Sequence, residues 1–393
     1  MAARIQRSSA DVSWLVSGSV VTAVGTHVKM LVALDIDGTV MSSGGVVAAA
    51  VRRSIGLVRA AGHLLVLATG RSLAGALPVA ELLGLADCYV VCSNGALTIR
   101  LDAGAPGGYH YARSELFDAT AVIHRALELH PTVRVAVEEP GWGWRVSAPF
   151  GPGQLNGEQK TASVADLCVS PATRMVLAAP GVRQHLDALR ATGVTVTPAG
   201  RAWLDVTGTG VTKASALEAL RDKLDVPREA TVAVGDSEND VEALVWAGRG
   251  ISMGHAPAAV RAAADEVTGT VDEDGVATAL DPLLPDIDTT LLPDLAAQLA
   301  VAVESAPGVA KLRVWHGSGA DLAGAEIHSA IARAWVRHAP IAAIGGVTML
   351  DLIAAADIAG LRYPTTDLGP SARWTRTDPA IGPALYELPL GRH

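Results

Sequence analysis

The 393-residue sequence has few aromatic residues, few cysteines and no surplus of positive charge. Aromatic side chains make up 4% of the residues, so Ala, Val and Leu supply most of the apolar half, a composition that suits helices packed on a Val-rich sheet. The three cysteines, Cys88, Cys92 and Cys168, show no metal-site spacing and indicate small core residues in a reducing compartment. No run reaches the roughly 18 consecutive apolar residues that indicate a membrane helix.

The formal net charge of −9 argues against nucleic acid as a partner, because phosphate backbones are bound chiefly by clustered Lys and Arg. An acidic protein can still bind a small phosphorylated molecule where a metal ion and a few cations concentrate positive charge. We therefore expect a small-molecule substrate and neither a nucleic acid nor a membrane as partner.

The first residues show a weak targeting signal. Residues 14–24 are mildly apolar and follow Arg4 and Arg7, as in a signal peptide, but Ser, Gly and Thr residues interrupt them. The first expected core strand begins almost immediately afterwards. We interpret residues 1–29 as an N-terminal extension and expect a cytoplasmic protein.

Apolar runs that alternate with helical periodicity predict a doubly wound, Rossmann-like parallel sheet. The pattern begins with β-α-β-α-β and resumes, after an interruption, with a helix, a strand, a helix and a strand. The first group covers residues 31–34, 46–61, 63–68, 73–83 and 88–92, and the second covers residues 213–224, 231–235, 238–247 and 250–253.

The interruption is an α+β insertion with Gly and Pro punctuation. Its expected strands are residues 133–137, 144–147 and 174–178, and its expected helix is residues 182–191. We therefore predict a core made of residues 30–96 and 201–280, divided by an inserted domain at residues 97–200.

Residues 281–393 form the third expected unit, a small α/β domain behind a Pro-rich linker at residues 281–288. Helices are expected at residues 291–304, 326–336 and 349–359, and a strand at residues 311–315. The histidines His316, His328 and His338 of this unit are scattered, and the Gly317-Ser318-Gly319 loop lacks the lysine and spacing of a P-loop. We expect a role in homo-oligomerisation or in substrate access, and the sequence leaves both open.

The first chemical motif, Asp35-Ile36-Asp37-Gly38-Thr39, directly follows the first strand. Side chains at i and i+2 of an extended chain share one side, so both carboxylates face the carboxyl end of the sheet, where open α/β sheets bind ligands. Paired carboxylates at that point suit Mg²⁺ and allow one of them to attack phosphorus. An ordinary Asp-Gly turn is the alternative for the motif alone.

Three further segments follow predicted strands or open predicted helices. The hydroxyl and backbone N–H groups of Thr69-Gly70-Arg71 can bind phosphoryl oxygens. The alternative is that this segment is an ordinary N-cap of the following helix. Lys213 is expected to begin a helix. A lone lysine at such a position is usually a solvent-exposed surface residue without a specific role. The run at residues 235–240 supplies three carboxylates and one amide, which suit a metal site or a helix dipole.

In this order, the four motifs closely resemble the signature of the haloacid dehalogenase-like superfamily, over about residues 30–280. Residues 38–68 leave no room for a large insert between the first two motifs, so the insert lies between Thr69 and Lys213. An α+β insert there resembles the cap of the Cof-type sugar phosphatases, as does the stretch Ser93-Asn94-Gly95-Ala96.

The resemblance implies a role for each motif residue. Asp35 would be the nucleophile, and Asp37 the acid that protonates the leaving group and then the base that activates water. Mg²⁺ would be held by the Asp35 carboxylate, the Asp37 backbone carbonyl and Asp236, with Asp240 behind them. The phosphate-binding and loop-anchoring candidates are Thr69, Gly70, Arg71, Asn94, Lys213 and Asn239.

The cap would choose the leaving group of the substrate. Glu138 and Trp144 stand in a polar and aromatic cluster with Glu139, Trp142 and Arg145. Indole faces and carboxylates suit sugar or cyclitol hydroxyls, and Arg174 is a candidate for a second anionic group. The alternative is a cap hairpin with packed tryptophans and solvated charges.

The sequence thus predicts a Mg²⁺-dependent phosphomonoester hydrolase that acts through an aspartyl-phosphate on a small metabolite, a sugar or cyclitol phosphate. A phosphotransferase or mutase on the same core is one alternative. The other is a non-catalytic binding protein whose C-terminal domain carries the function.

Overall fold

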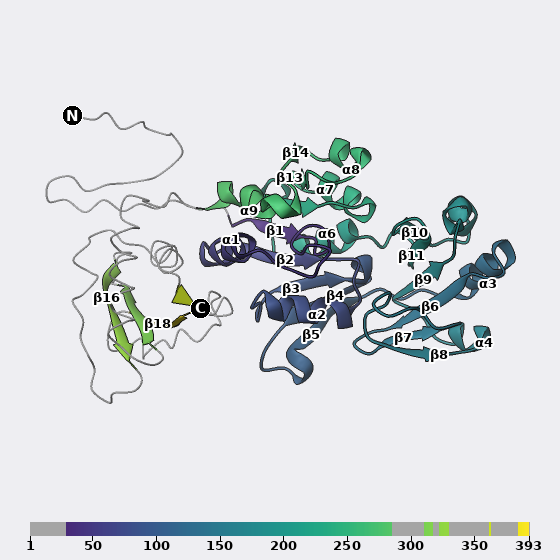
Figure 1. Cartoon of the computed structure of the whole chain (residues 1–393), viewed down its shortest axis with the longest axis horizontal. Coiled ribbons are helices and arrows are strands. Elements are labelled where there is room, and N and C mark those ends of the chain that lie inside the picture. The colour runs from purple at the N-terminus through teal and green to yellow at the C-terminus, as the bar shows by residue number, and fades with distance from the viewer. Residues whose placement is uncertain (1–28, 285–309, 317–321, 330–360, 363–383, 393) are drawn as a thin grey trace.

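The computed structural model describes residues 29–284, 310–316, 322–329, 361–362 and 384–392 (Figure 1). Within residues 29–284 the chain forms an α/β core and an inserted cap, each built on its own sheet. The described residues contain no helix long and apolar enough to cross a membrane.

The core is an eight-stranded sheet in the order β14-β13-β12-β1-β2-β3-β4-β5. The pairs from β14 to β3 are parallel, and β4 and β5 join antiparallel at one edge. The strands are β1 Leu31–Leu34, β2 Leu64–Ala68, β3 Tyr89–Cys92, β4 Leu97–Leu101, β5 Tyr109–Ser114, β12 Thr231–Gly235, β13 Arg249–Ser252 and β14 Glu266–Val267. The doubly wound parallel sheet predicted from the sequence is confirmed.

Helices cover both faces of this sheet because its central strands are apolar on both sides. In β1, Val32 and Leu34 pack with α1, α2 and α9, whereas Leu31 and Ala33 pack with α6, α7 and α8 on the other face. The helices are α1 Ala49–Ala60, α2 Leu73–Leu82, α6 Lys213–Lys223, α7 Val241–Trp246, α8 Ala258–Ala263 and α9 Gly275–Leu280.

The cap sheet has six strands in the order β10-β11-β9-β6-β7-β8, antiparallel except for the β7–β8 pair. Its helices pack with Val135, Met175 and Leu204 on one face, while Trp144 and Val176 belong to a separate apolar cluster on the other. The elements are α3 Thr120–Leu129, β6 Arg134–Glu139, β7 Gly143–Val146, β8 Glu158–Thr161, α4 Val164–Leu167, β9 Arg174–Ala178, α5 Leu186–Arg190, β10 Thr195–Pro198 and β11 Trp203–Thr207.

The cap boundaries expected at residues 97 and 200 need correction. Strands β4 and β5 belong to the core sheet, because the chain after β3 turns back and pairs antiparallel before it leaves for the cap. At the other end, β11 still belongs to the cap sheet. After β3 the alternation of strands and helices stops, but the next two strands still belong to the core, where they form its antiparallel edge.

The C-terminal strands form a four-stranded sheet in the order β16-β15-β18-β17. Strand β15 confirms the strand expected at residues 311–315, but β16 takes up residues that were expected to begin a helix at 326. The helices expected at residues 291–304 and 349–359 lie outside the described residues. The strands are β15 Ala310–His316, β16 Leu322–Ser329, β17 Leu361–Arg362 and β18 Ala384–Arg392.

Candidate active site

The first and fourth motifs meet because β1 and β12 are neighbouring parallel strands. Asp35 follows β1, and its backbone N–H donates to the carbonyl oxygen of Val234 at 3.0 Å, which ties the two loops together at the carboxyl edge of the sheet. Carboxylate oxygens of Asp35, Asp236 and Asp240 all lie within 4.8 Å of one another. Segments about 200 residues apart in the chain therefore form one acidic cluster.

Lys213 lies at the buried side of this cluster. Its side chain is 1% exposed, and Nζ donates to Oδ1 of Asp35 and to Oδ1 of Asp240, at 2.6 Å in both cases. Burial alone would lower the pKa of Lys213, but the charges of Asp240 and Asp35 outweigh it and raise that pKa. The lysine is therefore a fixed cation between two carboxylates.

The other carboxylates of the cluster differ in how many of their oxygens are occupied. Both oxygens of Asp240 accept hydrogen bonds, one from Lys213 and the other from the backbone N–H groups of Asp236 and Ser237 at 3.1 and 2.9 Å. Asp236 accepts from the Ser237 hydroxyl at 3.1 Å and from Thr39 at 3.4 Å. Asp240 therefore holds the loop and the lysine in place, whereas Oδ2 of Asp236 has only Nε2 of His255 nearby, at 3.6 Å, beyond hydrogen-bond range among the described residues.

Burial raises the pKa of Asp35 well above its usual range, and the negative charge of Asp240 adds to this effect although Lys213 opposes it. Burial and Asp240 likewise raise the pKa of Asp236. Three carboxylates thus share one ammonium group, and their charges repel one another. A divalent cation with oxygen preference fits this donor set, because it would balance the remaining negative charge.

Gly38 lets Asp236 approach the first motif. Its φ of +79° lies in the left-handed region, and a Cβ at this position would come within 2.3 Å of Oδ2 of Asp236. A side chain here would be strained and would displace the carboxylate. The glycine in the Asp-x-Asp-Gly-Thr motif therefore has a packing reason that involves the fourth motif.

Asp37 lies apart from the acidic cluster and pairs with Arg71 of the second motif. The Arg71 guanidinium donates to both oxygens of Asp37, at 2.7 Å from Nε and 2.6 Å from Nη2. The Asp37 side chain is 58% exposed, so its carboxylate remains open to the cavity and to water. The expected contribution of its backbone carbonyl to a metal site stays a prediction.

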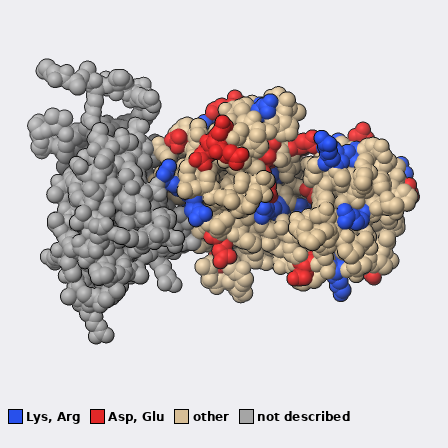
Figure 2. All heavy atoms as spheres, viewed as in Figure 1, with Lys and Arg blue, Asp and Glu red and all other residues tan. Residues whose placement is uncertain are grey.

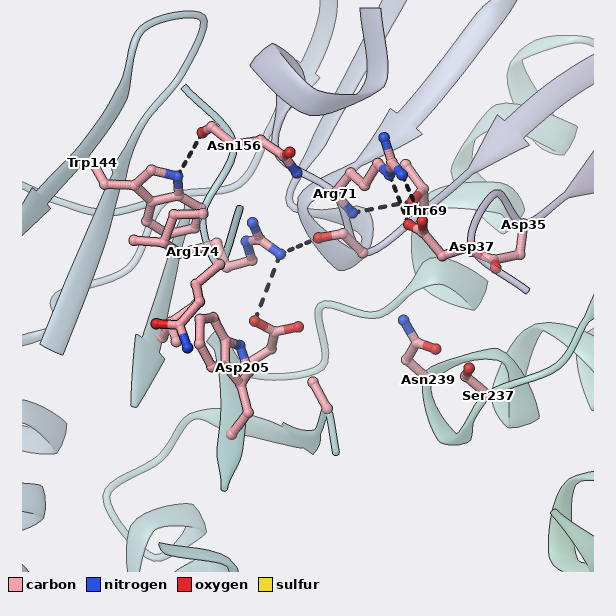
Figure 3. Close-up of a pocket in the computed structure, with 16 residues that line it drawn as sticks. Asp35, Asp37, Thr69, Arg71, Trp144, Asn156, Arg174, Asp205, Ser237 and Asn239 are labelled. Atoms are coloured by element: carbon pink, nitrogen blue, oxygen red, sulfur yellow. Dashed lines mark hydrogen bonds and ion pairs between the residues drawn. The ribbon is translucent and has the colours of Figure 1, made fainter. Parts of the chain in front are cut away.

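Core and cap enclose a cavity of about 430 Å³. Figure 2 shows the molecule hollowed between these two parts, and Figure 3 shows core residues on one side of the cavity and cap residues on the other. The core side is lined by Asp35, Asp37, Thr69, Gly70, Arg71, Ser237 and Asn239, and the cap side by Trp144, Gln154, Leu155, Asn156, Arg174, Val176, Ala199, Trp203 and Asp205.

Two residues expected to touch the substrate are buried behind this lining. Asn94 donates from Nδ2 to Asp205 at 2.8 Å and accepts from Asn239 at 2.9 Å. Glu138 accepts from Ser93 at 2.8 Å and from Arg174 at 3.2 Å. Neither lines the cavity, so each acts through the neighbour that it holds. Both contact a partner across the boundary between core and cap, Asn94 with Asp205 and Glu138 with Ser93.

Asp205 and Trp203 on β11 line the cavity but were not identified from the sequence. A signal was present: in the run Trp-Leu-Asp-Val-Thr, Leu204 and Val206 alternate with more polar residues. Such alternation predicts a strand that points Asp205 away from the apolar cap core. Both residues lie beyond the expected cap boundary at residue 200, so that boundary places them outside the cap.

A model of the haloacid dehalogenase-like hydrolase family matches residues 32–121 and 178–280. A phosphoglycolate phosphatase from Halorubrum lacusprofundi is 31% identical over 249 residues, which cover 63% of this chain and 94% of that protein. The chain belongs to the haloacid dehalogenase-like hydrolase family. Its predicted class, a phosphatase of this family, is confirmed.

Other similar proteins agree with this family membership. The 5-amino-6-(5-phospho-D-ribitylamino)uracil phosphatase YitU of Bacillus subtilis is 26% identical over 64% of this chain and 96% of its own. The fold matches that of the phosphatase BT1666 from Bacteroides thetaiotaomicron, with a TM-score of 0.56 at 23% identity over 68% and 99% of the two chains. The HAD subclass IIB sugar phosphatase BT4131 matches with the same score and identity over 65% and 98%.

Proposed function

We propose that this member of the family is a Mg²⁺-dependent phosphomonoesterase that hydrolyses a small phosphorylated metabolite through an aspartyl-phosphate on Asp35. The observation that carries the proposal is the meeting of Asp35, Asp236 and Asp240 around the buried Lys213 at one end of the cavity. A nucleophile, a fixed cation and an acidic cluster suited to a metal ion are thereby brought to one place.

Asp35 is the group placed to attack phosphorus. One of its oxygens is held by Lys213, and the residue lines the cavity, so its position is set before the substrate arrives. Preorganised charges of this kind stabilise a transition state without further reorganisation. The bond from Asp35 to phosphorus forms as the bond from phosphorus to the leaving oxygen breaks. Water then attacks the phosphorus, the bond to the Asp35 oxygen breaks, and phosphate and the free carboxylate result.

Asp37 is the group placed to move the proton. From its position beside the cavity it would donate a proton to the departing oxygen and then take one from the attacking water. Arg71 fixes the orientation of this carboxylate through two hydrogen bonds. Thr69 and Asn239 stand at the same end of the cavity, where their polar groups can bind phosphoryl oxygens.

Asp35 and Asp236 would hold the metal ion, because Asp240 has both oxygens occupied by other donors. When bound, Mg²⁺ supplies charge neutralisation for a phosphoryl group next to a carboxylate nucleophile. Lys213 neutralises part of the same charge from the protein side and remains in contact with Asp35 throughout.

The cap side of the cavity supports a sugar or related polyol phosphate as substrate. Trp203 lines it together with the polar side chains of Gln154 and Asn156, a mixture of an aromatic ring and amide groups that suits carbon-bound hydroxyls. Trp144 is buried beneath the Arg174 guanidinium and supports this wall from behind. The relatives' names differ in substrate, one a ribitylamino-uracil phosphate and another phosphoglycolate. The residues of this chain's own cap, and not the relatives' names, therefore indicate the leaving group of its substrate.

The test is phosphate release from a panel of phosphate esters with and without Mg²⁺, for the native chain and for Asp35→Asn. We expect activity that chelation abolishes and Mg²⁺ restores, and a loss of ~10³-fold or more in the variant. Asp187→Asn, which alters an almost fully exposed carboxylate of the cap, is the control and should retain activity.

A phosphorylated Asp35 peptide, found after rapid acid quench during turnover, would support the covalent step. Transfer of phosphate to an added sugar or polyol in preference to water would instead favour the phosphotransferase alternative. No turnover of any ester with the metal present would refute the proposal.

A further inference from the structure

Asp205 is a buried carboxylate on the cap side of the cavity. The residue is 6% exposed, and its Oδ2 accepts a hydrogen bond from Asn94. Its Oδ1 is buried and has no hydrogen-bond partner among the described residues, although Nη1 of Arg174 lies 3.6 Å away. The charge of Asp205 is therefore offset by one hydrogen bond and by a guanidinium beyond hydrogen-bond range, and it remains at the cavity wall.

Arg174 does not make this end of the cavity positive. Its guanidinium donates to Glu138 at 3.2 Å and to the carbonyl oxygen of Gly70, and it lies 4.8 Å from the centre of the Trp144 ring. Together with Asp205, two buried carboxylates surround one guanidinium. The cap end is therefore neutral or negative, and the second anionic group expected on Arg174 has no free cation to bind.

We propose that Asp205 selects substrates whose leaving group carries a hydroxyl or amino donor at the cap end, and disfavours those with a carboxylate or second phosphate there. The inference rests on the proposed function, since it concerns the leaving group of that reaction. A hydroxyl or amino group at this wall of the cavity can donate to the Asp205 carboxylate, whereas an anion there would be repelled by it. Discrimination that combines a missing hydrogen bond with charge repulsion is stronger than either alone.

The experiment uses pairs of substrates that differ only at the end remote from the phosphate. Ribitol 5-phosphate and 5-phosphoribonate have the same five-carbon chain, ending in a primary alcohol or a carboxylate. Glycerol 3-phosphate and 3-phosphoglycerate repeat the comparison with three carbons. p-Nitrophenyl phosphate, which has neither group, reports whether the phosphatase chemistry works at all.

In the full-length protein we expect kcat/KM to be at least about tenfold higher for the alcohol of the pair whose length reaches Asp205. The variant Asp205→Asn keeps an acceptor for Asn94 and offers an N–H donor to the cavity, so the alcohol-to-carboxylate ratio should fall by about tenfold. Asp187→Asn removes the same charge from the exposed face of the cap and should leave the ratio unchanged.

Each outcome decides the matter. Equal kcat/KM for both members of both pairs in the native protein would overturn the inference, as would an equal ratio in Asp205→Asn and Asp187→Asn. If the native protein does not hydrolyse p-nitrophenyl phosphate at all, the result would instead count against the proposed function.

Thermal unfolding reports whether Asp205→Asn is folded, and Asp205→Ser replaces it if it is not.

Competition between the two five-carbon compounds for the native protein tests the preference without any variant. Tighter inhibition by the carboxylate than by the alcohol would also refute it.

Discussion

At the scale of single residues, the site depends on oppositely charged side chains that are buried from solvent and bonded to one another. Lys213 would be costly to bury alone, and its two carboxylate partners compensate that cost through short hydrogen bonds. Removing one partner of such a pair leaves the other charge buried and is expensive, so this cluster tolerates few substitutions. Asp37 stands outside the cluster and is more exposed than its members, as suits a group that exchanges protons with the substrate and with water.

Gly38→Ala tests how closely the first motif and Asp236 must approach. The added methyl group would meet Oδ2 of Asp236 at 2.3 Å, so the carboxylate must move and the Mg²⁺ dependence of activity should shift to at least about tenfold higher concentration. The variant should also lose about 1 kcal/mol or more of unfolding free energy, because its φ is positive.

Gly45→Ala is the matched control for this prediction. Gly45 has nearly the same φ, +76°, but nothing lies within 4 Å of an added Cβ. It should show the conformational destabilisation in urea unfolding without the change in metal dependence. Equal metal dependence in the two variants would contradict the role given to Gly38.

At the scale of elements, helix α6 begins in a way that serves Lys213. Thr212 accepts a hydrogen bond from the backbone N–H of Ser215, and the Ser215 hydroxyl accepts one from the backbone N–H of Thr212. A cation in the first turn opposes the helix dipole. The capping box offsets this unfavourable placement and fixes where the lysine leaves the helix.

Thr212→Ala removes one half of this capping box. We expect a loss of about 1 kcal/mol in unfolding free energy, measured by urea denaturation, together with a lower kcat as the start of α6 loosens around Lys213. Thr212→Ser keeps the side-chain acceptor and should retain both properties. If Thr212→Ala lost the expected unfolding free energy but kept its kcat, the capping box would not position the lysine.

At the scale of the whole molecule, the cavity lies between two separately packed domains. The apolar clusters of core and cap do not merge among the described residues, and polar contacts such as Ser93–Glu138 and Asn94–Asp205 join the domains. The exposed pair Arg183–Glu238 adds a third contact at 2.9 Å. Domains joined mainly by polar contacts can separate at modest cost, which would allow substrate entry and product release.

Truncation after Leu284 tests whether this pair of domains is a complete enzyme. Among the residues that the structure describes, those that line the cavity and those that form the apolar clusters all precede residue 285. We therefore expect the shortened chain to keep kcat/KM within about threefold of the full chain when both are assayed with Mg²⁺. A larger loss, or a change in molecular mass by light scattering, would assign residues 285–393 a role in access or assembly.

The sequence alone determined the repeating strand and helix pattern and the four motifs. Each follows from local physics: apolar runs form buried strands, and polar residues directly after parallel strands collect at one edge. Asp35 and Asp236 could be predicted for this reason, because both directly follow parallel strands. Lys213 opens a helix, and its role was predicted only from the resemblance of the four motifs to the family signature.

Only the tertiary structure decided which side chains face one another across the domain boundary. The roles of Glu138, Asn94 and Asp205 depend on how a mainly antiparallel cap sheet sits over the parallel core, and no local pattern encodes that placement. The antiparallel strands β4 and β5 also escaped prediction, because short strands after a loss of α/β rhythm resemble the start of a new domain. Chemistry near the chain's own motifs was thus readable in sequence, whereas selection of the leaving group depends on contacts between distant segments.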